Sequence, residues 1–367
     1  MARWCAGALR WICVSMLAAC GLQPTAAPQP GEPARVRMPA PPRTVPTPGR
    51  LDDNAGCVRC HPLVAQEWQR SQHRSAYSDP EFARVQARER VDVCQPCHAP
   101  EADPSRVADA AAAEHGVACT SCHVPHDGDG RVLAAPHGGA APHGLRREVA
   151  FATAAACAGC HEFDFASQPG QPMQRTISEH RASRFADVSC ASCHMPWVGE
   201  GDARHRSHDF AASRDPAVLR DAVVVTVARA DDSHVRIALA PGAVGHAFPT
   251  GDLFRQLLVE AEGFDHDGDP VAYDARVLAR HFVSTRGLGS GGGMRLLHDD
   301  RVGAHGDAPV IVELDLGEDA SALRVRWRVV HQRAEFPLPD GDAVLAGETE
   351  VLAGELAPIG GDTVRQR

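Results

Sequence analysis

Aromatic side chains make up only 5% of the 367 residues, and no cysteine follows Cys193. Between Leu51 and Pro216, large apolar side chains are too sparse to bury a conventional core for a segment of that length. The apolar run Trp11–Ala19 is too short to span a bilayer as a helix. The first half of the chain therefore needs apolar surface from another source, and chemistry that depends on cysteine is confined to it.

Ten of the 13 cysteines fall in five copies of the pattern Cys-x-x-Cys-His. Two thiols at this spacing can add to the two vinyl groups of one haem, and the histidine that follows is placed to ligate the iron. The five sets are Cys57, Cys60 and His61; Cys94, Cys97 and His98; Cys119, Cys122 and His123; Cys157, Cys160 and His161; and Cys190, Cys193 and His194. The sequence thus predicts five covalently bound haems c, with these histidines as proximal ligands. The macrocycles would supply the missing apolar surface.

Three other readings of paired cysteines are zinc ribbons, a thioredoxin-like redox pair and structural disulfides. Zinc ribbons use paired Cys-x-x-Cys knuckles and give no reason for a histidine directly after each pair. With 20 histidines in the chain, chance would place one after all five pairs about once in a million cases. Haem attachment is the reading that explains the repeated histidine.

The N-terminus has the pattern of an export signal. Arg3 and Arg10 precede the apolar run, which ends in Leu17-Ala-Ala-Cys20. This ending looks like a bacterial lipobox, so we expect residues 1–19 to be removed as a signal peptide and a lipid to be attached to Cys20. An ordinary secretory signal is the alternative. Residues 20–50 are rich in proline and predict an extended tether.

Residues 51–214 form the predicted pentahaem domain. The pattern Cys57-Val-Arg-Cys60-His61, the later Ser71-Gln-His73, the lead-in His115-Gly-Val-Ala-Cys119 and the ending Cys193-His194-Met195-Pro196 resemble multihaem cytochromes of the cytochrome c-554 type. In that family, the histidines matching His73 and His115 are distal ligands, often to a neighbouring haem. The resemblance covers roughly residues 51–210. We also expect a helix over residues 103–115.

Residues 215–367 change in character. Short β-type runs alternate with Gly, Asp and Pro turns; in the segment 323–329 the apolar side chains fall on one face and three arginines on the other. This predicts a β-sandwich-like domain and, for the whole chain, an α+β fold. The stretch Gly245-His246-Ala-Phe-Pro249-Thr250-Gly251 resembles a signature of β-domains that follow multihaem modules. His246 could therefore ligate a haem; a structural loop is the alternative.

Counting ligands links the motifs to a function. Five irons with one proximal histidine each need five more ligands if all are six-coordinate. The candidate distal ligands are His73, His115, His180, His208 and His246, with His205 as a substitute for His208. The three histidines in the loop 126–143 are expected to be solvated. Haems with histidine on both sides transfer electrons and leave no position for a substrate.

We therefore expect a lipid-anchored electron-transfer protein without catalytic residues. The alternative is a multihaem oxidoreductase acting on a small nitrogen or sulfur species at one five-coordinate haem. The formal net charge of -10 disfavours nucleic acid as a partner and favours basic or neutral redox proteins. The expected location is the periplasmic side of a bacterial membrane, with the outer membrane favoured because Gly21 lacks the aspartate that commonly retains lipoproteins at the inner membrane.

Overall fold

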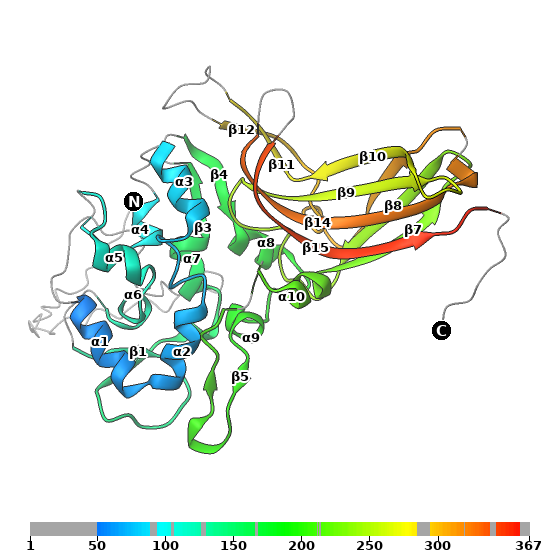
Figure 1. The fold of residues 1–367 in the computed structure, drawn as a ribbon. Helices are drawn as coiled ribbons and strands as arrows, with labels where there is room; N and C mark the ends of the chain where they lie inside the picture. The colour runs from blue at the N-terminus through cyan, green and yellow to red at the C-terminus, as the bar shows by residue number, and fades with distance from the viewer. Residues whose placement is uncertain are drawn as a thin grey trace, which may run out of the picture. The chain divides into compact units, whose positions relative to one another are not determined.

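The computed structural model of the chain describes residues 50–88, 94–103, 106–125, 130–165, 168–210, 212, 214–284, 294–318, 320–337 and 343–359. The predicted signal peptide and Cys20 lie outside the described residues, as does the predicted tether up to residue 49. The α+β class is confirmed: short helices occupy the first half and the second half is rich in strands (Figure 1). The described residues belong to one compact unit, Val36–Arg367, so the boundary between residues 214 and 215 stays a prediction.

Each Cys-x-x-Cys-His motif lies on a short helix that ends at its histidine or one residue before it, except that Cys94 directly precedes its helix. Residues three apart lie on one side of a helical turn, so the two thiols face the same way, as attachment to one macrocycle requires. The five motif helices are α1 (Arg50–Cys60), α4 (Gln95–His98), α6 (Cys119–His123), α7 (Ala155–His161) and α9 (Cys190–His194).

Other short elements connect the motifs. The helices are α2 (Pro62–Arg70), α3 (Pro80–Arg88), α5 (Ala110–His115), α8 (Thr176–Ala182) and α10 (Pro216–Asp221), with 3-10 turns at Val149–Ala152 and Gly201–Ala203. Three two-stranded ribbons pair β1 (Val132–Ala134) with β2 (Leu145–Arg147), β3 (Glu162–Phe165) with β4 (Gln168–Arg175), and β5 (Trp197–Val198) with β6 (His205–Arg206). Among the described residues, no helix is both long and apolar enough to cross a membrane.

The helix expected over residues 103–115 is shorter than predicted. It begins at Ala110, because the Asp109 side chain accepts a hydrogen bond from the Ala112 backbone N–H and so caps the helix. It ends before Gly116, whose φ is 54°. A Cβ atom at Gly116 would lie 2.5 Å from the His73 carbonyl oxygen, so only glycine allows this approach. The Val117 N–H donates to the same carbonyl at 2.8 Å, which ties the His73 segment to the lead-in of the third motif.

The second half forms two antiparallel sheets and a separate hairpin (Figure 1). One sheet has the order β10-β9-β14-β15 and the other the order β13-β8-β7. The strands are β7 (Val223–Arg229), β8 (His234–Pro241), β9 (Arg255–Phe264), β10 (Pro270–Leu278), β13 (Val310–Asp315), β14 (Arg324–Pro337) and β15 (Ala343–Leu356), and the hairpin pairs β11 (Arg280–Ser284) with β12 (Met294–Asp299). A 3-10 turn spans Ala320–Ala322.

The apolar cores of the two halves differ in size. In the sheets, twenty buried residues form one cluster, which includes Ile237, Val259 and Val325. In the helical half, the described residues form a cluster of five, Tyr77, Phe82, Ala99, Ala102 and Ala112. The sheets therefore have a conventional core, whereas the helical half has the small core that its composition predicts.

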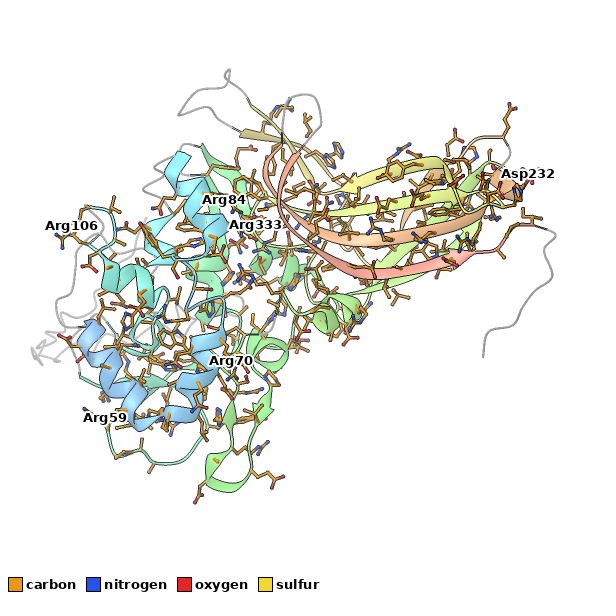
Figure 2. All side chains as sticks on the ribbon, in the orientation of Figure 1. Arg59, Arg70, Arg84, Arg106, Asp232 and Arg333 are labelled. Carbon is orange, nitrogen blue, oxygen red and sulfur yellow. The ribbon has the colours of Figure 1, made fainter. Side chains whose placement is uncertain are left out.

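A buried ion-pair network joins helix α8 to the sheet-rich half. The Arg301 side chain is 3% exposed, and its Nη2 lies 2.6 Å from Glu179 Oε1 and 2.7 Å from Asp299 Oδ2. Its Nη1 donates to the Pro249 carbonyl at 2.8 Å. A second ion pair joins Arg333 of β14, labelled in Figure 2, to Glu81 of α3 at 3.4 Å. Arg301 thus neutralises two carboxylates that have little access to water.

We expect Arg301→Met to lower the free energy of unfolding by about 3–5 kcal/mol, because it leaves two carboxylates buried without a counter-charge. Urea unfolding of the haem-loaded protein, followed by circular dichroism, measures the loss. Arg326→Met is the matched control: Arg326 is 47% exposed beside Glu355, and such pairs contribute less than about 1 kcal/mol. Equal losses in the two variants would contradict the role given to Arg301.

Candidate haem-binding site

The thiols of different motifs come close together. Numbered in chain order, motifs 1 to 5 contain His61, His98, His123, His161 and His194. Thiols of different motifs lie close enough to shift one another's pKa: Cys57 and Cys119 of motifs 1 and 3, Cys97 and Cys160 of motifs 2 and 4, and Cys157 and Cys190 of motifs 4 and 5. All ten motif cysteines are free of disulfides. Groups attached to these thiols would therefore be immediate neighbours, with motif 4 next to both motif 2 and motif 5.

The spacing of histidine rings tests whether the motifs fit haem. A metal–imidazole bond of about 2.0 Å, plus about 1.2 Å from the nitrogen to the ring centre, puts two imidazoles on opposite sides of one iron about 6.4 Å apart, centre to centre. Four motif histidines have a second histidine ring near this distance. The pairs are His61 with His143 at 6.2 Å, His123 with His208 at 6.2 Å, His161 with His73 at 6.3 Å, and His194 with His246 at 6.3 Å.

Hydrogen bonds orient several of these rings in the same way. The Nδ1 atom of His123 lies 2.8 Å from the Leu133 carbonyl oxygen, and that of His208 lies 2.8 Å from the Arg206 carbonyl oxygen. The Nδ1 atom of His246 lies 3.0 Å from the Ala247 carbonyl oxygen. A histidine that donates from Nδ1 to a carbonyl offers Nε2 to a metal, which is the usual arrangement of metal-bound histidine.

Burial lowers the pKa of five of these imidazoles and keeps them neutral: those of His73, His123, His161, His208 and His246. It lowers the pKa of His73 to about 3, with the nearby His161, His208, His194 and His98 acting in the same direction. Burial likewise lowers the pKa of His161 and of His208 to about 4. Neutral imidazole is the form that ligates a metal, so the site holds the rings ready for binding at neutral pH. The histidines that act on His73 place it near motifs 2, 4 and 5 and near His208.

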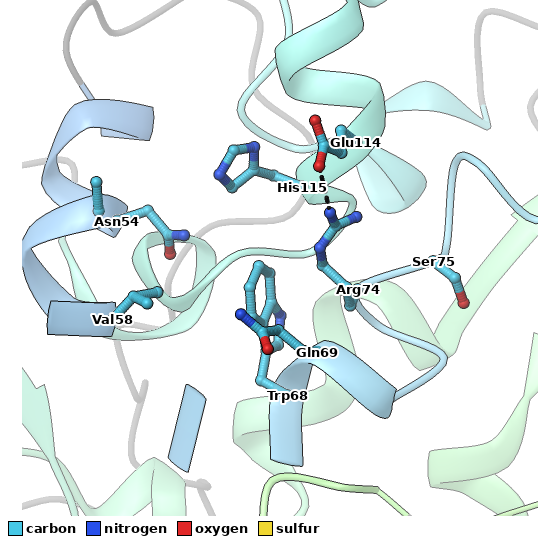
Figure 3. Close-up of a pocket in the computed structure, with 9 residues that line it drawn as sticks. Asn54, Val58, Trp68, Gln69, Arg74, Ser75, Glu114 and His115 are labelled. Carbon is cyan, nitrogen blue, oxygen red and sulfur yellow. Dashed lines mark hydrogen bonds and ion pairs between the residues drawn. The ribbon is translucent and has the colours of Figure 1, made fainter. Parts of the chain in front are cut away.

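Two of the predicted distal ligands, His115 and His180, do not face a motif histidine in this way. The His115 ring borders a cavity of about 570 Å³ and has Trp68 as its ring neighbour at 6.2 Å. In Figure 3, His115 lies opposite Asn54 and Val58, and Arg74 is paired with Glu114 at its side. The Nε2 atom of His180 lies 2.9 Å from the Val188 carbonyl oxygen, and its buried Nδ1 has no hydrogen-bond partner.

The structure also separates His205 from His208. Both nitrogens of His205 are engaged: Nδ1 lies 2.7 Å from the Ala203 carbonyl oxygen and Nε2 lies 3.1 Å from Glu67 Oε1. The same Glu67 carboxylate accepts a hydrogen bond from the His208 backbone N–H at 2.9 Å. Glu67 thus holds this segment in place, and it is the His208 ring, not that of His205, that faces His123.

His143 is predicted to be a solvated loop residue, and it is exposed in the structure, yet its ring lies 6.2 Å from that of His61. It lies in a loop rich in Gly and Pro, where no spacing distinguishes it from His137. The signal is in the fold: strands β1 and β2 pair in parallel, and the Val132 N–H donates to the Gly144 carbonyl at 2.9 Å. This pairing fixes the loop next to His143. The third histidine of the loop, His126, lies outside the described residues.

Motif 2 differs from the other four. The His98 ring stacks on Phe82 with centres 4.0 Å apart, and its Nδ1 lies 2.7 Å from the Ala76 carbonyl oxygen. Among the residues that the structure describes, no second histidine ring lies at the axial spacing from His98. Burial lowers the pKa of His98, and the nearby charges include Asp252 and Arg333 from the sheet-rich half.

The Gly-His-x-x-Pro-Thr-Gly loop is held by residues of both halves. Thr250 donates a hydrogen bond to Glu179 at 2.6 Å, and Arg301 binds the Pro249 carbonyl. A Cβ atom at Gly245 would lie 3.2 Å from a ring carbon of His180, so glycine permits the close packing of the loop on helix α8. This packing gives His180 a structural contact and brings His246 to His194.

The zinc and disulfide readings find no support in this arrangement. Among the described residues, the group of His, Cys, Asp and Glu side chains close enough to hold one metal ion contains no motif cysteine. No described motif cysteine is part of a disulfide. Free thiols in pairs, each followed by a histidine with a facing ring in four of five cases, fit covalent haem with axial histidines.

Comparison with known proteins agrees with this geometry. Residues 56–124 match the family described as "Cytochrome c554 and c-prime". The crystal structure of a penta-heme cytochrome c552 from Thermochromatium tepidum is similar over 82% of this chain and 97% of that chain, with a TM-score of 0.60 and 20% sequence identity. No curated protein matches the chain. Residues 56–124 are thus similar to this cytochrome family, and the chain has the fold of the penta-heme cytochrome.

Proposed function

We propose that the chain binds five haems c and passes electrons along them while anchored to a membrane by a lipid on Cys20. Haem iron with two axial histidines supplies one-electron transfer without an open position for substrate. The observation that carries the proposal is the set of four histidine pairs with ring centres 6.2–6.3 Å apart. These pairs make His143, His208, His73 and His246 the proposed distal ligands of motifs 1, 3, 4 and 5.

The contacts between motifs suggest a branched path. Motif 1 adjoins motif 3 through Cys57 and Cys119, and the charge of Cys160 in motif 4 acts on Cys122 in motif 3. Motif 4 also adjoins motif 2 and motif 5 through its thiols. These contacts place motifs 1, 3, 4 and 5 in a row, with motif 2 as a branch at motif 4. Electrons that pass between motif 1 or 3 and motif 2 or 5 go through motif 4.

The histidine pairs can be tested at motif 1. We expect His143→Ala to convert one haem per chain from low-spin to high-spin, because the variant removes one axial nitrogen. Electron paramagnetic resonance of the ferric protein measures the change. His137→Ala is the matched control, since His137 is an exposed residue of the same loop. If the spectra of both variants equal that of the parent protein, His143 is not an axial ligand.

The anchor rests on the sequence Leu17-Ala-Ala-Cys20 and the proline-rich residues 20–50. A lipid at Cys20 would hold the protein at the periplasmic side of a membrane, and the tether would let it reach redox proteins. Because the net charge is -10, basic or neutral partners suit it best.

We expect Cys20→Ser to move the protein from the membrane fraction to the soluble periplasmic fraction, because serine cannot carry the lipid. Fractionation followed by haem staining measures this. Cys13→Ser is the control, since Cys13 would leave with the signal peptide. A membrane-bound Cys20→Ser variant would contradict lipid anchoring, whereas the haem spectrum should be the same in all three proteins.

A second candidate function is reduction or oxidation of a small nitrogen or sulfur species at motif 2. Two observations favour it: His98 has no facing histidine ring among the described residues, and Asp252 and Arg333 act on it. An open iron position beside an acid and a cation is what such an enzyme requires. The Asp252 carboxyl is held in its charged form, since the nearby Arg255 and Arg333 lower its pKa despite its burial.

The two functions predict different spectra. If motif 2 is open, the ferric parent protein has one high-spin haem per chain, and the ferrous protein binds one carbon monoxide per chain. His98→Ala serves as the matching variant, because it should change only the haem that takes up carbon monoxide. If the parent protein is entirely low-spin and binds no carbon monoxide, motif 2 has two ligands and the electron-transfer function alone remains.

A further inference from the structure

The hairpin β11–β12 carries three metal-binding side chains on one face. His281 and His298 are direct partners across the two strands, and their rings stack with centres 4.0 Å apart. Asp300 follows His298 by two positions, so it lies on the same side of the strand. Asp299, between them, points the other way and binds Arg301 at 2.7 Å. The cluster is separate from all five haem motifs.

We propose that His281, His298 and Asp300 bind one divalent transition-metal ion of the zinc or copper class. Ligand atoms from the three side chains all lie within 4.8 Å of one another. His281 Nε2 lies 3.0 Å from Asp300 Oδ1, and His298 Nε2 lies 3.7 Å from Asp300 Oδ2. Ligands that bind one metal at about 2.0–2.1 Å are separated by about 3 Å, so only a small movement of His298 closes the set.

The carboxylate of this cluster is held in place by the backbone. The Ala279 N–H donates to Asp300 Oδ1 at 2.7 Å, and the Asp300 N–H donates to the Ala279 carbonyl at 3.2 Å. The ladder between the strands is irregular directly after His281, between His281 and Phe282. Such irregularities redirect side chains and are frequent beside functional sites. Two of the three ligands are therefore positioned by the fold before any metal binds.

The donor set determines the kind of metal. Calcium and magnesium prefer oxygen ligands in larger numbers, which disfavours both. Two imidazoles and one carboxylate on one side of an ion suit zinc, copper or non-haem iron, and leave further positions for water or another ligand. The His298 side chain is 60% exposed and the His281 side chain 31% exposed, so an ion can enter from solvent.

An ion bound at the hairpin would also affect the strand β4, which lies beside it. Arg280, next to His281, donates to the Met173 carbonyl of β4 at 2.7 Å. The next residue of β4 is Gln174, and its Nε2 atom lies 3.0 Å from Nδ1 of His161 in motif 4. A metal that fixes His281 against His298 would therefore stiffen the hairpin beside the strand that orients His161. The proposal does not depend on the electron path, because the three ligands touch no haem motif.

Zinc binding to the untagged, haem-loaded protein tests the proposal. After treatment with a chelator and dialysis, titration with ZnCl₂ is followed by calorimetry, and bound zinc is counted by elemental analysis. We expect one zinc per chain in the parent protein, and binding at least about 100-fold weaker in His298→Gln and Asp300→Asn, because each loses one of three ligands. His266→Gln is the matched control: His266 is 88% exposed in a turn of the same half.

Two results would overturn the proposal. The first is a parent protein that binds no zinc in a fixed ratio; the second is a His298→Gln variant that binds zinc as the parent does. The haem absorption spectrum and reduction potentials of His298→Gln, measured without zinc, should equal those of the parent. That comparison distinguishes loss of a zinc site from damage to the haem-binding half.

Discussion

Two imidazole rings held on opposite sides of one position, about 6.4 Å apart between centres, are the constraint on which this structure depends. One ring of each pair comes from a motif and is placed by a single helical turn. The other comes from a distant part of the chain: His73 lies 88 residues before His161, by subtraction of their numbers, and His246 lies 52 residues after His194. Each pair therefore closes a long loop, and bringing its ends together costs entropy.

The second rings are oriented by their backbone surroundings. His208 and His246 each hydrogen-bond through Nδ1 to a carbonyl within two residues, so the local chain sets the direction of the ring. His180 shows the opposite arrangement: its Nε2 is used by the Val188 carbonyl, and it packs on Gly245. His208 and His246 thus leave Nε2 available, whereas His180 leaves Nδ1 available.

The sequence predicts the attachment points and not the ring pairs, for a physical reason. Cysteines three apart, followed by histidine, are a local pattern, so their geometry follows from one turn of helix. The alternation in β14 is also local: Val325 and Val329 are fully buried, and the arginines between them are on the opposite face. The pairing of His143 with His61 depends on the parallel contact of β1 with β2, which no local pattern encodes. His115 matches a family motif, yet its ring lies beside Trp68, because the turn at Gly116 places it there.

The sheet-rich half fixes the position of the His246 ring. A helical half with five clustered core residues cannot by itself fix a side chain as far along the chain as His246. The sheet-rich half has its own core of twenty buried residues and can hold a loop rigidly. Arg301, between Glu179 of α8 and the Pro249 carbonyl of the loop, transmits that rigidity to the segment that precedes motif 5. Because the ion pair between Arg301 and Glu179 is almost fully buried, breaking it would leave charged groups without a counter-charge and with little water, at a large cost in free energy. The position of His246 relative to His194 is thus set by the packing of the sheets, and the β half supplies one ring of a pair whose other ring belongs to the helical half.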